Sequence, residues 1–527
     1  MAALNQGMSS LGGKDAPLSE AKSMAKSPSA PRFIIIGAGS RGQKYADATC
    51  SATGGIISAV AEPIESKRNR LGRKHIWGAE GPQEGQAFSH WREFRDYEVK
   101  RREREAAGEK NVPKGVDGVF ICVLDELHKE VVVALAPLDL HIMCEKPLAC
   151  SLDDCLAIYR ALKGHDKKIF HIGHVLRYSP HNVLLRRLLL EERAIGDINS
   201  VVHTEPVGWW HYTHSYVRGN WRNSETTGPS LLTKSCHDID LLLWLLCSPT
   251  KSGQGENHLP SYVQSTGGLQ YFKKSRKPAK AGDATNCMKC PLGDEGCKYS
   301  AKNVYLSDRY QGLGTGNLDW PVHIVAHDIE DFGTRQEQED ALTRVLEEDY
   351  DKSTPRNVVQ SRNWFGRCVF ESDNNVCDDE FVTITWDEQG DKPAKRVAFH
   401  MVAQTEKQCD RHATYYGEHG EIHADSKCIT VTDFETKNVK SYNPKVEDIG
   451  HGGGDVGLTR QFVLACERVK NDGWQAERAQ HEILGCTLED TLRSHAMVFA
   501  AEEARLQRKV VDWADFWERE VLEGVNA

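Results

Sequence analysis

The sequence contains no hydrophobic run that approaches the roughly 18–20 residues needed for a membrane-spanning helix. It also has no excess of basic residues, since 66 lysines and arginines stand against 76 aspartates and glutamates and the formal net charge is −10. Proteins that bind nucleic acid or anionic membranes generally need a positive field to attract phosphate. We therefore expect neither kind of partner and favour chemistry on a small molecule.

An apolar leader and a disulfide framework are missing as well. Residues 1–31 are rich in Ser, Ala, Lys and Gly, which predicts a disordered tail rather than a signal or transit peptide. Sixteen cysteines are present, but several, such as Cys122 and Cys144, lie inside apolar segments where a reduced cysteine acts as a small hydrophobe. These features predict a reducing compartment and hence a cytoplasmic protein.

With 527 residues, the chain is long enough for two sizeable domains. Up to about residue 176, short apolar segments alternate with helical ones, as is typical of a parallel sheet covered by helices on both faces. The predicted strands are 33–36, 55–61, 116–124, 138–144 and 168–173. We expect an α/β domain with a doubly wound parallel sheet over residues 32–176.

The pattern changes after that point. β-rich segments at 381–386, 396–404, 421–424 and 429–432, with helices at 238–247, 457–469 and 488–507, predict an α+β domain over residues 177–527 with a mostly antiparallel open sheet. Residues 253–362, rich in Gly, Lys, Asn and Asp, are predicted to be an insertion. An exposed antiparallel sheet would favour a homo-oligomer, either a dimer or a tetramer.

A glycine-rich turn follows the first strand directly. Gly37 permits the tight turn, Gly39 lets the backbone approach a pyrophosphate, and Gly42 lets the next helix pack closely on the strand. The amides of that helix, which begins near Ser40 and Arg41, would face the phosphates. This arrangement predicts a dinucleotide site.

Glu62 ends the second strand, where a carboxylate can accept hydrogen bonds from a ribose 2′-hydroxyl. Because a carboxylate repels a 2′-phosphate, NAD is the first choice. Lys67 and Arg68 follow closely and keep NADP as an alternative. A solvated carboxylate at a strand end is the competing interpretation of Glu62.

Lys146 has a position that suits proton transfer. Pro147 biases it towards an extended backbone, so it is predicted at the carboxyl edge of the sheet, where open α/β folds bind ligands. The alternative interpretation is that Lys146 is a solvated loop residue without a role in chemistry. A lysine beside a nucleotide site is a candidate for acid/base chemistry.

Several motifs in order resemble the Gfo/Idh/MocA oxidoreductases. They are the glycine turn at 37–42, the segments 123–128 and 145–149, and the segment 236–241. The resemblance covers about residues 32–250 well and about 380–510 more loosely. It implies an N-terminal Rossmann domain, a C-terminal α/β domain, and oxidation or reduction of sugars and cyclitols with NAD(P).

The resemblance also implies roles for single residues. Lys146 would lie between cofactor and substrate, and His237 would project into the same cleft; either could take the proton of a carbinol hydroxyl. Asp125, His128 and Glu145 would lie beside the cofactor, with His128 capping a helix near the nicotinamide pocket.

One position departs from the family pattern. The aspartate that commonly lies four residues before the histidine is Thr233 here, followed by Lys234. Threonine can bind a substrate hydroxyl but cannot hold a proton as a carboxylate does. Either Lys146 and His237 act alone, or Lys234 supplies a cation that depresses its neighbour's pKa.

Aromatic and guanidinium side chains cluster just upstream of this motif. Flat rings and fork-like donors, here Trp221 and Arg218, suit a polyhydroxylated or acidic ligand, and Arg177 is a further cleft candidate. Packing of a long loop explains the same residues equally well. We predict substrate contacts for Trp221, Arg218, Arg177, Thr233 and Lys234.

Two other segments have simpler interpretations. Cys287, Cys290 and Cys297 have a metal-like spacing, but a zinc site would need a fourth ligand from a distant loop or His258, so reduced surface cysteines are favoured. Residues 451–455 contain three glycines before a helix and are predicted to be a flexible lead-in whose last residue caps that helix.

The sequence thus predicts an NAD(P)-dependent oxidoreductase that acts on a sugar-like or cyclitol-like secondary alcohol or its ketone. An NAD-using lyase or glycosidase that oxidises its substrate transiently is one alternative. A non-catalytic NAD(P)-sensing regulatory protein is another, although such a protein would not need both Lys146 and His237.

Overall fold

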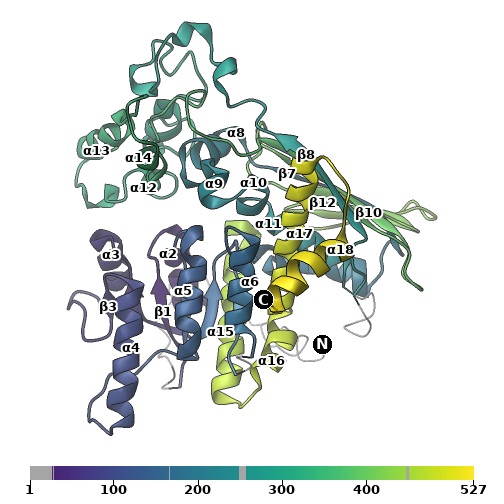
Figure 1. The fold of residues 1–527 in the computed structure, drawn as a ribbon, viewed down its shortest axis with the longest axis horizontal. Helices are drawn as coiled ribbons and strands as arrows, with labels where there is room; N and C mark the ends of the chain where they lie inside the picture. The colour runs from purple at the N-terminus through teal and green to yellow at the C-terminus, as the bar shows by residue number, and fades with distance from the viewer. Residues whose placement is uncertain (1–26, 28, 165–166, 249–256, 447–449, 527) are drawn as a thin grey trace.

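In the computed structural model, residues 27, 29–164, 167–248, 257–446 and 450–526 are described (Figure 1). The predicted disordered tail lies almost wholly outside these residues. Within them, no helix combines the length and the apolar character needed to cross a membrane. All sixteen cysteines lie outside disulfide bonds.

The N-terminal sheet is parallel throughout, as predicted. Its six strands lie in the order β3 (Ala87–Phe88), β2 (Ile56–Ala61), β1 (Arg32–Ile36), β4 (Gly118–Ile121), β5 (His141–Cys144) and β6 (Phe170–Ile172). The order reverses direction at β1, so the carboxyl ends of β1 and β4 meet at the switch point of a doubly wound sheet.

Alternate residues of β1 pack into two different cores. Phe33 and Ile35 face a layer that contains α2 (Ser40–Ala52), α3 (Glu65–His75) and α15 (Gly454–Asn471). Ile34 and Ile36 face a layer that contains α4 (Trp91–Ala106), α5 (His128–Leu135) and α6 (Leu152–Leu162). The strand is therefore apolar on both faces, as buried parallel strands are.

The placement of α15 corrects the predicted division of the chain at residue 176. Leu458 and Phe462 of α15 pack against Phe33 and Phe120 of the N-terminal sheet. The chain therefore returns to the first domain after it has built the second, because the sheet needs a helix beside α2 to cover its face.

The second sheet has nine strands and is mostly antiparallel, as predicted, with β7 and β10 as its parallel pair. Its order is β14 (Val439–Tyr442), β13 (Ile429–Asp433), β12 (Gly420–Asp425), β11 (His412–Gly417), β7 (Ile198–Pro206), β10 (Lys395–Val402), β9 (Asp379–Trp386), β8 (Tyr262–Gly268) and β15 (Val511–Asp512). The helices α11 (Cys236–Leu246) and α17 (Leu488–Gln507) belong to the core beside it, while Val202, Phe381 and Tyr416 leave exposed apolar surface on its strands.

Short helices complete the chain. They are α7 (Pro180–Arg186), α8 (Trp209–Tyr212), α9 (Ser224–Thr227), α10 (Ser230–Thr233), α12 (Val322–Val325), α14 (Arg356–Gln360), α16 (Ala476–Ala479), α18 (Trp513–Phe516) and α19 (Glu523–Asn526), with a longer helix α13 (Arg335–Glu347).

The insertion occupies 269–378, between the neighbouring strands β8 and β9, rather than the predicted 253–362. It has its own apolar core, in which Val304, Val322 and Leu342 pack with Trp210 of α8. The insertion stands above α3 in Figure 1, and Arg70 of α3 forms an ion pair with Glu330 at 2.9 Å. It therefore contacts both domains.

Candidate active site

The glycine turn has the geometry that a dinucleotide site needs. Gly37 has a φ of +93°, and a Cβ there would lie 2.4 Å from the carbonyl oxygen of Cys122. A Cβ on Gly42 would lie 2.0 Å from the carbonyl oxygen of Gly37, whereas one on Gly39 would meet nothing within 4 Å. The helix α2 begins at Ser40 with no acidic residue in its first turn and no side-chain cap. Its amides and the space at Gly39 fit a pyrophosphate.

Glu62 lies at the same turn. One carboxylate oxygen accepts from the amide of Ala38 at 2.7 Å and the other from the amide of Ile64 at 2.9 Å. These bonds hold the carboxylate at the end of β2, where it could accept from a ribose hydroxyl. Burial lowers the pKa of nearby Lys67, and the charge of Glu62 opposes that shift.

Lys146 follows the end of β5 by two residues, and its bond to Pro147 is cis. Its Nζ donates to the carbonyl oxygen of Thr233 at 2.7 Å and lies 4.8 Å from the ring centre of Trp221. The indole of Trp221 donates in turn to Asp125 at 2.7 Å, and burial raises the pKa of that carboxyl against the opposing charge of Lys146. The predicted Lys146, Asp125 and Trp221 therefore form one cluster.

His128 supports this cluster from behind. Its ring is fully buried, with Nδ1 at 2.7 Å from the carbonyl oxygen of Pro147 and Nε2 at 3.3 Å from that of Val123. The structure therefore gives His128 a role in holding two backbone segments together, in place of the predicted contact with the cofactor.

An ion network joins the glycine turn to the lysine. Arg41 donates to Glu145 at 2.8 Å and to Asp455 of α15 at 2.8 Å, and the hydroxyl of Tyr45 also donates to Glu145. Burial alone would raise the pKa of Glu145, but Arg41 and Tyr45 hold it below its ordinary value. The second oxygen of Glu145 accepts from the amide of Lys146 at 3.1 Å. Arg41 therefore helps to fix the backbone that carries Lys146.

His237 stands at the start of α11 and is 5% exposed. Its ring centre lies 5.9 Å from that of His451 and 6.1 Å from that of His174. Burial, followed by the charge of Lys146, lowers the pKa of His237 well below its ordinary value. Among the described atoms its Nδ1 has no hydrogen-bond partner. The protonated form of His237 is therefore disfavoured, and its ring presents an unpartnered nitrogen that a substrate hydroxyl could contact.

The predicted substrate contact of Thr233 is not supported. Its side chain is fully buried and donates to the carbonyl oxygen of Pro229 at 3.2 Å, so the residue acts through its backbone, which accepts from Lys146. Lys234 lies 3.0 Å from Glu205 and 3.0 Å from the thiol of Cys409. Its charge lowers the pKa of Cys409 against the larger effect of burial, and it also helps burial to lower the pKa of His211.

Two predicted arginines lie elsewhere. Arg218 is fully buried and donates to the carbonyl oxygens of Arg367 and Tyr299, each at 2.7 Å, so it ties the insertion to the second domain. Arg177 makes two bonds of 2.7 Å to Asp240. The prediction that these guanidinium groups orient the substrate is not supported, because Arg177 is paired with Asp240 and Arg218 is fully buried and bound to the insertion, although its Nη1 has no partner among the described atoms.

Sequence reasoning missed several groups near His237. Arg411 reaches Asp238 at 2.7 Å and Glu205 at 2.9 Å, and His211 lies 3.4 Å from the thiol of Cys409. The segment 451–455 carries a histidine and an aspartate four residues apart, and this spacing could have marked it as more than a lead-in.

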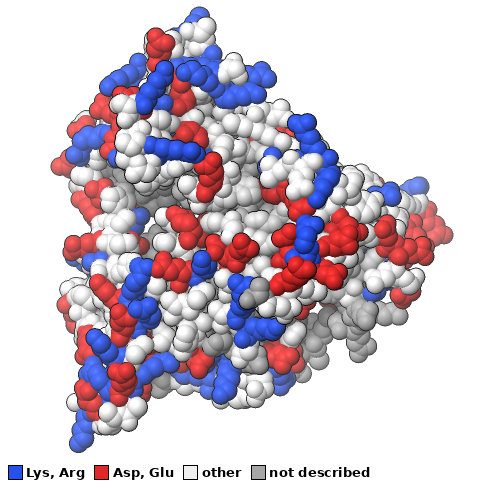
Figure 2. Space-filling model, viewed as in Figure 1, with Lys and Arg blue, Asp and Glu red and all other residues white. Residues whose placement is uncertain are grey.

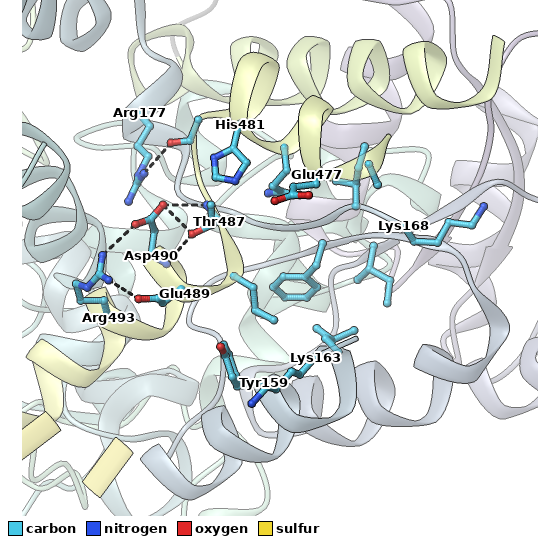
Figure 3. Close-up of a pocket in the computed structure, with 18 of the residues that line it drawn as sticks. Tyr159, Lys163, Lys168, Arg177, Glu477, His481, Thr487, Glu489, Asp490 and Arg493 are labelled. Carbon is cyan, nitrogen blue, oxygen red and sulfur yellow. Dashed lines mark hydrogen bonds and ion pairs between the residues drawn. The ribbon is translucent and has the colours of Figure 1, made fainter. Parts of the chain in front are cut away.

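A cavity of about 850 Å³ lies at the amino-terminal ends of strands β5 and β6 of the parallel sheet (Figure 3). Its lining includes Asp139 and Lys168, which precede β5 and β6, and Glu477 and His481 from the region of α16. Ligands of doubly wound sheets bind at the carboxyl edge, and this cavity lies at the amino edge. The cavity is therefore separate from the cluster around Lys146, which does not line it.

The three-cysteine metal hypothesis is not supported either. Across the described ranges, no group of three or more His, Cys, Asp or Glu side chains is arranged to hold a metal ion. Cys287 is buried and lies 3.3 Å from the guanidinium of Arg218.

Figure 2 shows acidic and basic side chains intermixed over the face in view.

Comparisons with known proteins agree with this geometry. A family model described as an oxidoreductase family with an NAD-binding Rossmann fold matches residues 31–174, and the model of its C-terminal α/β domain matches residues 187–255. The inositol 2-dehydrogenase of Corynebacterium glutamicum is 28% identical over 218 residues, which cover 41% of this chain and 53% of that protein.

The 2,7-anhydro-N-acetylneuraminate hydratase of Escherichia coli is 32% identical over 133 residues, which cover 25% of this chain and 34% of that protein. The chain therefore spans about a third to a half of the length of these curated relatives. A solved levoglucosan dehydrogenase, in complex with NADH and levoglucosan, has a TM-score of 0.55 at 14% identity and covers 92% of this chain and 99% of its own. At that identity the likeness shows the fold.

Proposed function

Because the chain belongs to the Gfo/Idh/MocA oxidoreductase family, we propose that it transfers hydride between NAD and a secondary alcohol of a sugar or cyclitol, or the corresponding ketone. The observation that carries this proposal is the meeting of two proton-transfer groups from different domains. Lys146 comes from the parallel sheet and His237 from α11, and the Nζ of Lys146 bonds to the backbone of Thr233, four residues before His237.

NAD would lie along the glycine turn, with its pyrophosphate at Gly39 and the start of α2 and a ribose at Glu62. When bound, it supplies a nicotinamide ring that takes the carbinol hydrogen with its electron pair. Ser40, Arg41 and Gly42 belong to this turn. The NAD-binding family model and the carboxylate at Glu62 both favour NAD over NADP.

The chain's own residues would manage the other proton. As the carbon loses hydride, its hydroxyl must lose a proton, and the neutral His237 can accept it. The ammonium of Lys146 can donate to the same oxygen and stabilise its developing negative charge. Trp221, held by Asp125, places its indole beside Lys146, where it can line the substrate position, and Lys234 offers a further donor.

Assembly and location follow as further parts of the proposal. The exposed apolar side chains on the second sheet, including Val202, Phe381 and Tyr416, support self-association into a dimer or tetramer. The sixteen cysteines, none of which forms a disulfide in the described residues, support a reducing compartment such as the cytoplasm.

The test has two steps. Mass spectrometry of the purified protein under native conditions should find bound NAD, and a panel of cyclitols and anhydrosugars, including myo-inositol and levoglucosan, should include one that produces NADH absorbance. Product formation without net NADH would mean that oxidation is only transient. A protein that binds NAD but converts no polyol would refute the dehydrogenase assignment.

A further inference from the structure

The segment that leads into α15 has an unfavourable backbone for its one non-glycine residue. His451, Gly452 and Gly453 are consecutive and have φ angles of 46°, 62° and 80°. Glycine adopts this region freely, whereas histidine does so rarely. The hydroxyl of Ser179 donates to the carbonyl oxygen of Gly452 at 2.9 Å and anchors the segment. The segment predicted to be a flexible lead-in is therefore a turn anchored by a hydrogen bond, and this anchoring restricts the orientation of the His451 side chain.

Asp455 fixes the orientation of that imidazole. Its carboxylate oxygens lie 3.1 and 3.2 Å from Nδ1 of His451, and one of them accepts from Arg41 at 2.8 Å. Burial alone would raise the pKa of Asp455, but Arg41 and His451 hold it well below its ordinary value. An ionised Asp455 accepts a hydrogen bond from the Nδ1–H of His451, so Nε2 is left as the nitrogen that can exchange protons.

His451 lies between a buried base and solvent. Its ring centre is 5.9 Å from that of His237, a distance that a direct contact or one water molecule can bridge. The side chain of His451 is 38% exposed, whereas His237 is 5% exposed and His174, on the other side of His237, is 1% exposed. Among the histidines next to His237, His451 is therefore the one with access to water.

We propose that His451, oriented by Asp455, relays the substrate proton between His237 and solvent. The inference rests on the proposed function. In the oxidation direction, the electron pair leaves the carbinol carbon with the hydride, and the hydroxyl proton passes to His237, then to Nε2 of His451, and then to water.

The need for such a relay follows from the burial of His237. Burial, followed by the charge of Lys146, makes a protonated His237 unfavourable, so a proton accepted there needs a further acceptor. Four charged or titratable groups among the described residues face His451: Asp455, Arg41, His237 and His211. Arg41 reaches His451 through the carboxylate of Asp455. Burial lowers the pKa of His211, and the charge of His451 adds to that effect.

Matched substitutions separate proton transfer from structure. His451→Asn suits the positive φ and can still donate to Asp455, but it cannot carry a proton. His451→Gly suits the backbone and opens space for free imidazole. His419→Ala, at the exposed turn between β11 and β12, is the control.

If the relay exists, His451→Asn lowers the single-turnover rate by about 100-fold, the lower range for an acid/base group. The substrate KM should change little, and added imidazole should restore the rate of His451→Gly. His419→Ala should behave as the wild type. A wild-type rate and pH–rate profile in His451→Asn would overturn the proposal.

A second readout does not depend on turnover. Nitrogen NMR of ¹⁵N-histidine-labelled protein should show that the neutral His451 ring carries its proton on Nδ1, and this signal should vanish in His451→Asn. A neutral ring that carries its proton on Nε2 would overturn the relay. If the wild type converts no polyol at all, the proposed function fails, and the NMR result still decides the role of His451.

Discussion

Replacement of Lys146 by methionine tests the centre of the site, because methionine keeps the length and apolar stem of lysine and removes its charge. The lost bond leaves the carbonyl oxygen of Thr233 without its 2.7 Å donor. An unsatisfied buried acceptor costs about 1–3 kcal/mol, so a modest fall in the free energy of unfolding is expected.

The expected loss of catalysis is larger and separable from the loss of stability. Removal of a positioned acid/base group lowers kcat by about 10²- to 10⁴-fold, which corresponds to about 3–5.5 kcal/mol of transition-state stabilisation. The charge of Lys146 also lowers the pKa of His237, so the acidic limb of the pH–rate profile should move to higher pH in the variant.

The assay compares single-turnover reduction of bound NAD with urea unfolding of the same preparations. Lys163→Met, an exposed lysine at the end of α6, is the control and should match the wild type. Lys146→Arg keeps the charge but holds its proton permanently. If Lys146→Arg retains full activity, Lys146 acts as a fixed cation; if Lys146→Met also retains it, our assignment of the site is wrong.

Three further predictions follow from single contacts. Gly39→Ala should leave the unfolding free energy unchanged, because its Cβ meets open space, but it should weaken NAD binding measured by calorimetry. Gly42→Ala should lower both the unfolding free energy and the affinity for NAD, since overpacking costs about 1–3 kcal/mol. Equal effects of the two substitutions would contradict the roles assigned to these glycines. Glu380 is buried beside Glu502, and burial followed by the charge of Glu502 raises the pKa of Glu380. The unfolding free energy of the wild type should therefore fall as the pH rises above the pKa of Glu380 in the unfolded state, while that of Glu380→Gln stays level. Urea titrations at several pH values measure this, and parallel pH curves for the two proteins would refute it. Arg218→Ala should lower the unfolding free energy by about 1–3 kcal/mol for each of the two buried carbonyl oxygens left without a donor. The substrate KM of the folded protein should change little, and a raised KM without destabilisation would return Arg218 to the substrate site.

Local pattern was enough to predict the strand, glycine turn and helix that open the first domain. The strand, the glycine turn and the next helix are continuous in the chain, and the roles of Gly37 and Gly42 depend on contacts within that unit or with the adjacent strand. Glu62 and Lys146 could be predicted because the carboxyl ends of parallel strands meet at one edge. The arrangement of the first sheet was therefore predictable from apolar periodicity and punctuation by glycine and proline.

The substrate side of the predicted site depended on distant partners. Arg177 and Arg218 have the composition of substrate-binding residues, but Asp240 and the carbonyl oxygens of the insertion occupy their donors. Residues 454–471 have an ordinary amphipathic pattern that does not say which sheet they cover. Pairings across such separations leave no spacing in the sequence by which they could be recognised.

By itself, the sequence determined the class of fold, the family and the dinucleotide turn, since these depend on short-range periodicity and on residues whose backbone preferences are intrinsic. Only the tertiary structure decided which polar groups remain free for chemistry. Folding bound Arg177 and Arg218 to internal partners and left Nδ1 of His237 without a partner. The return of α15 to the first sheet placed Asp455 and His451 beside His237. A side chain's chemistry is set by its residue type, but its availability is set by the partners that folding places next to it.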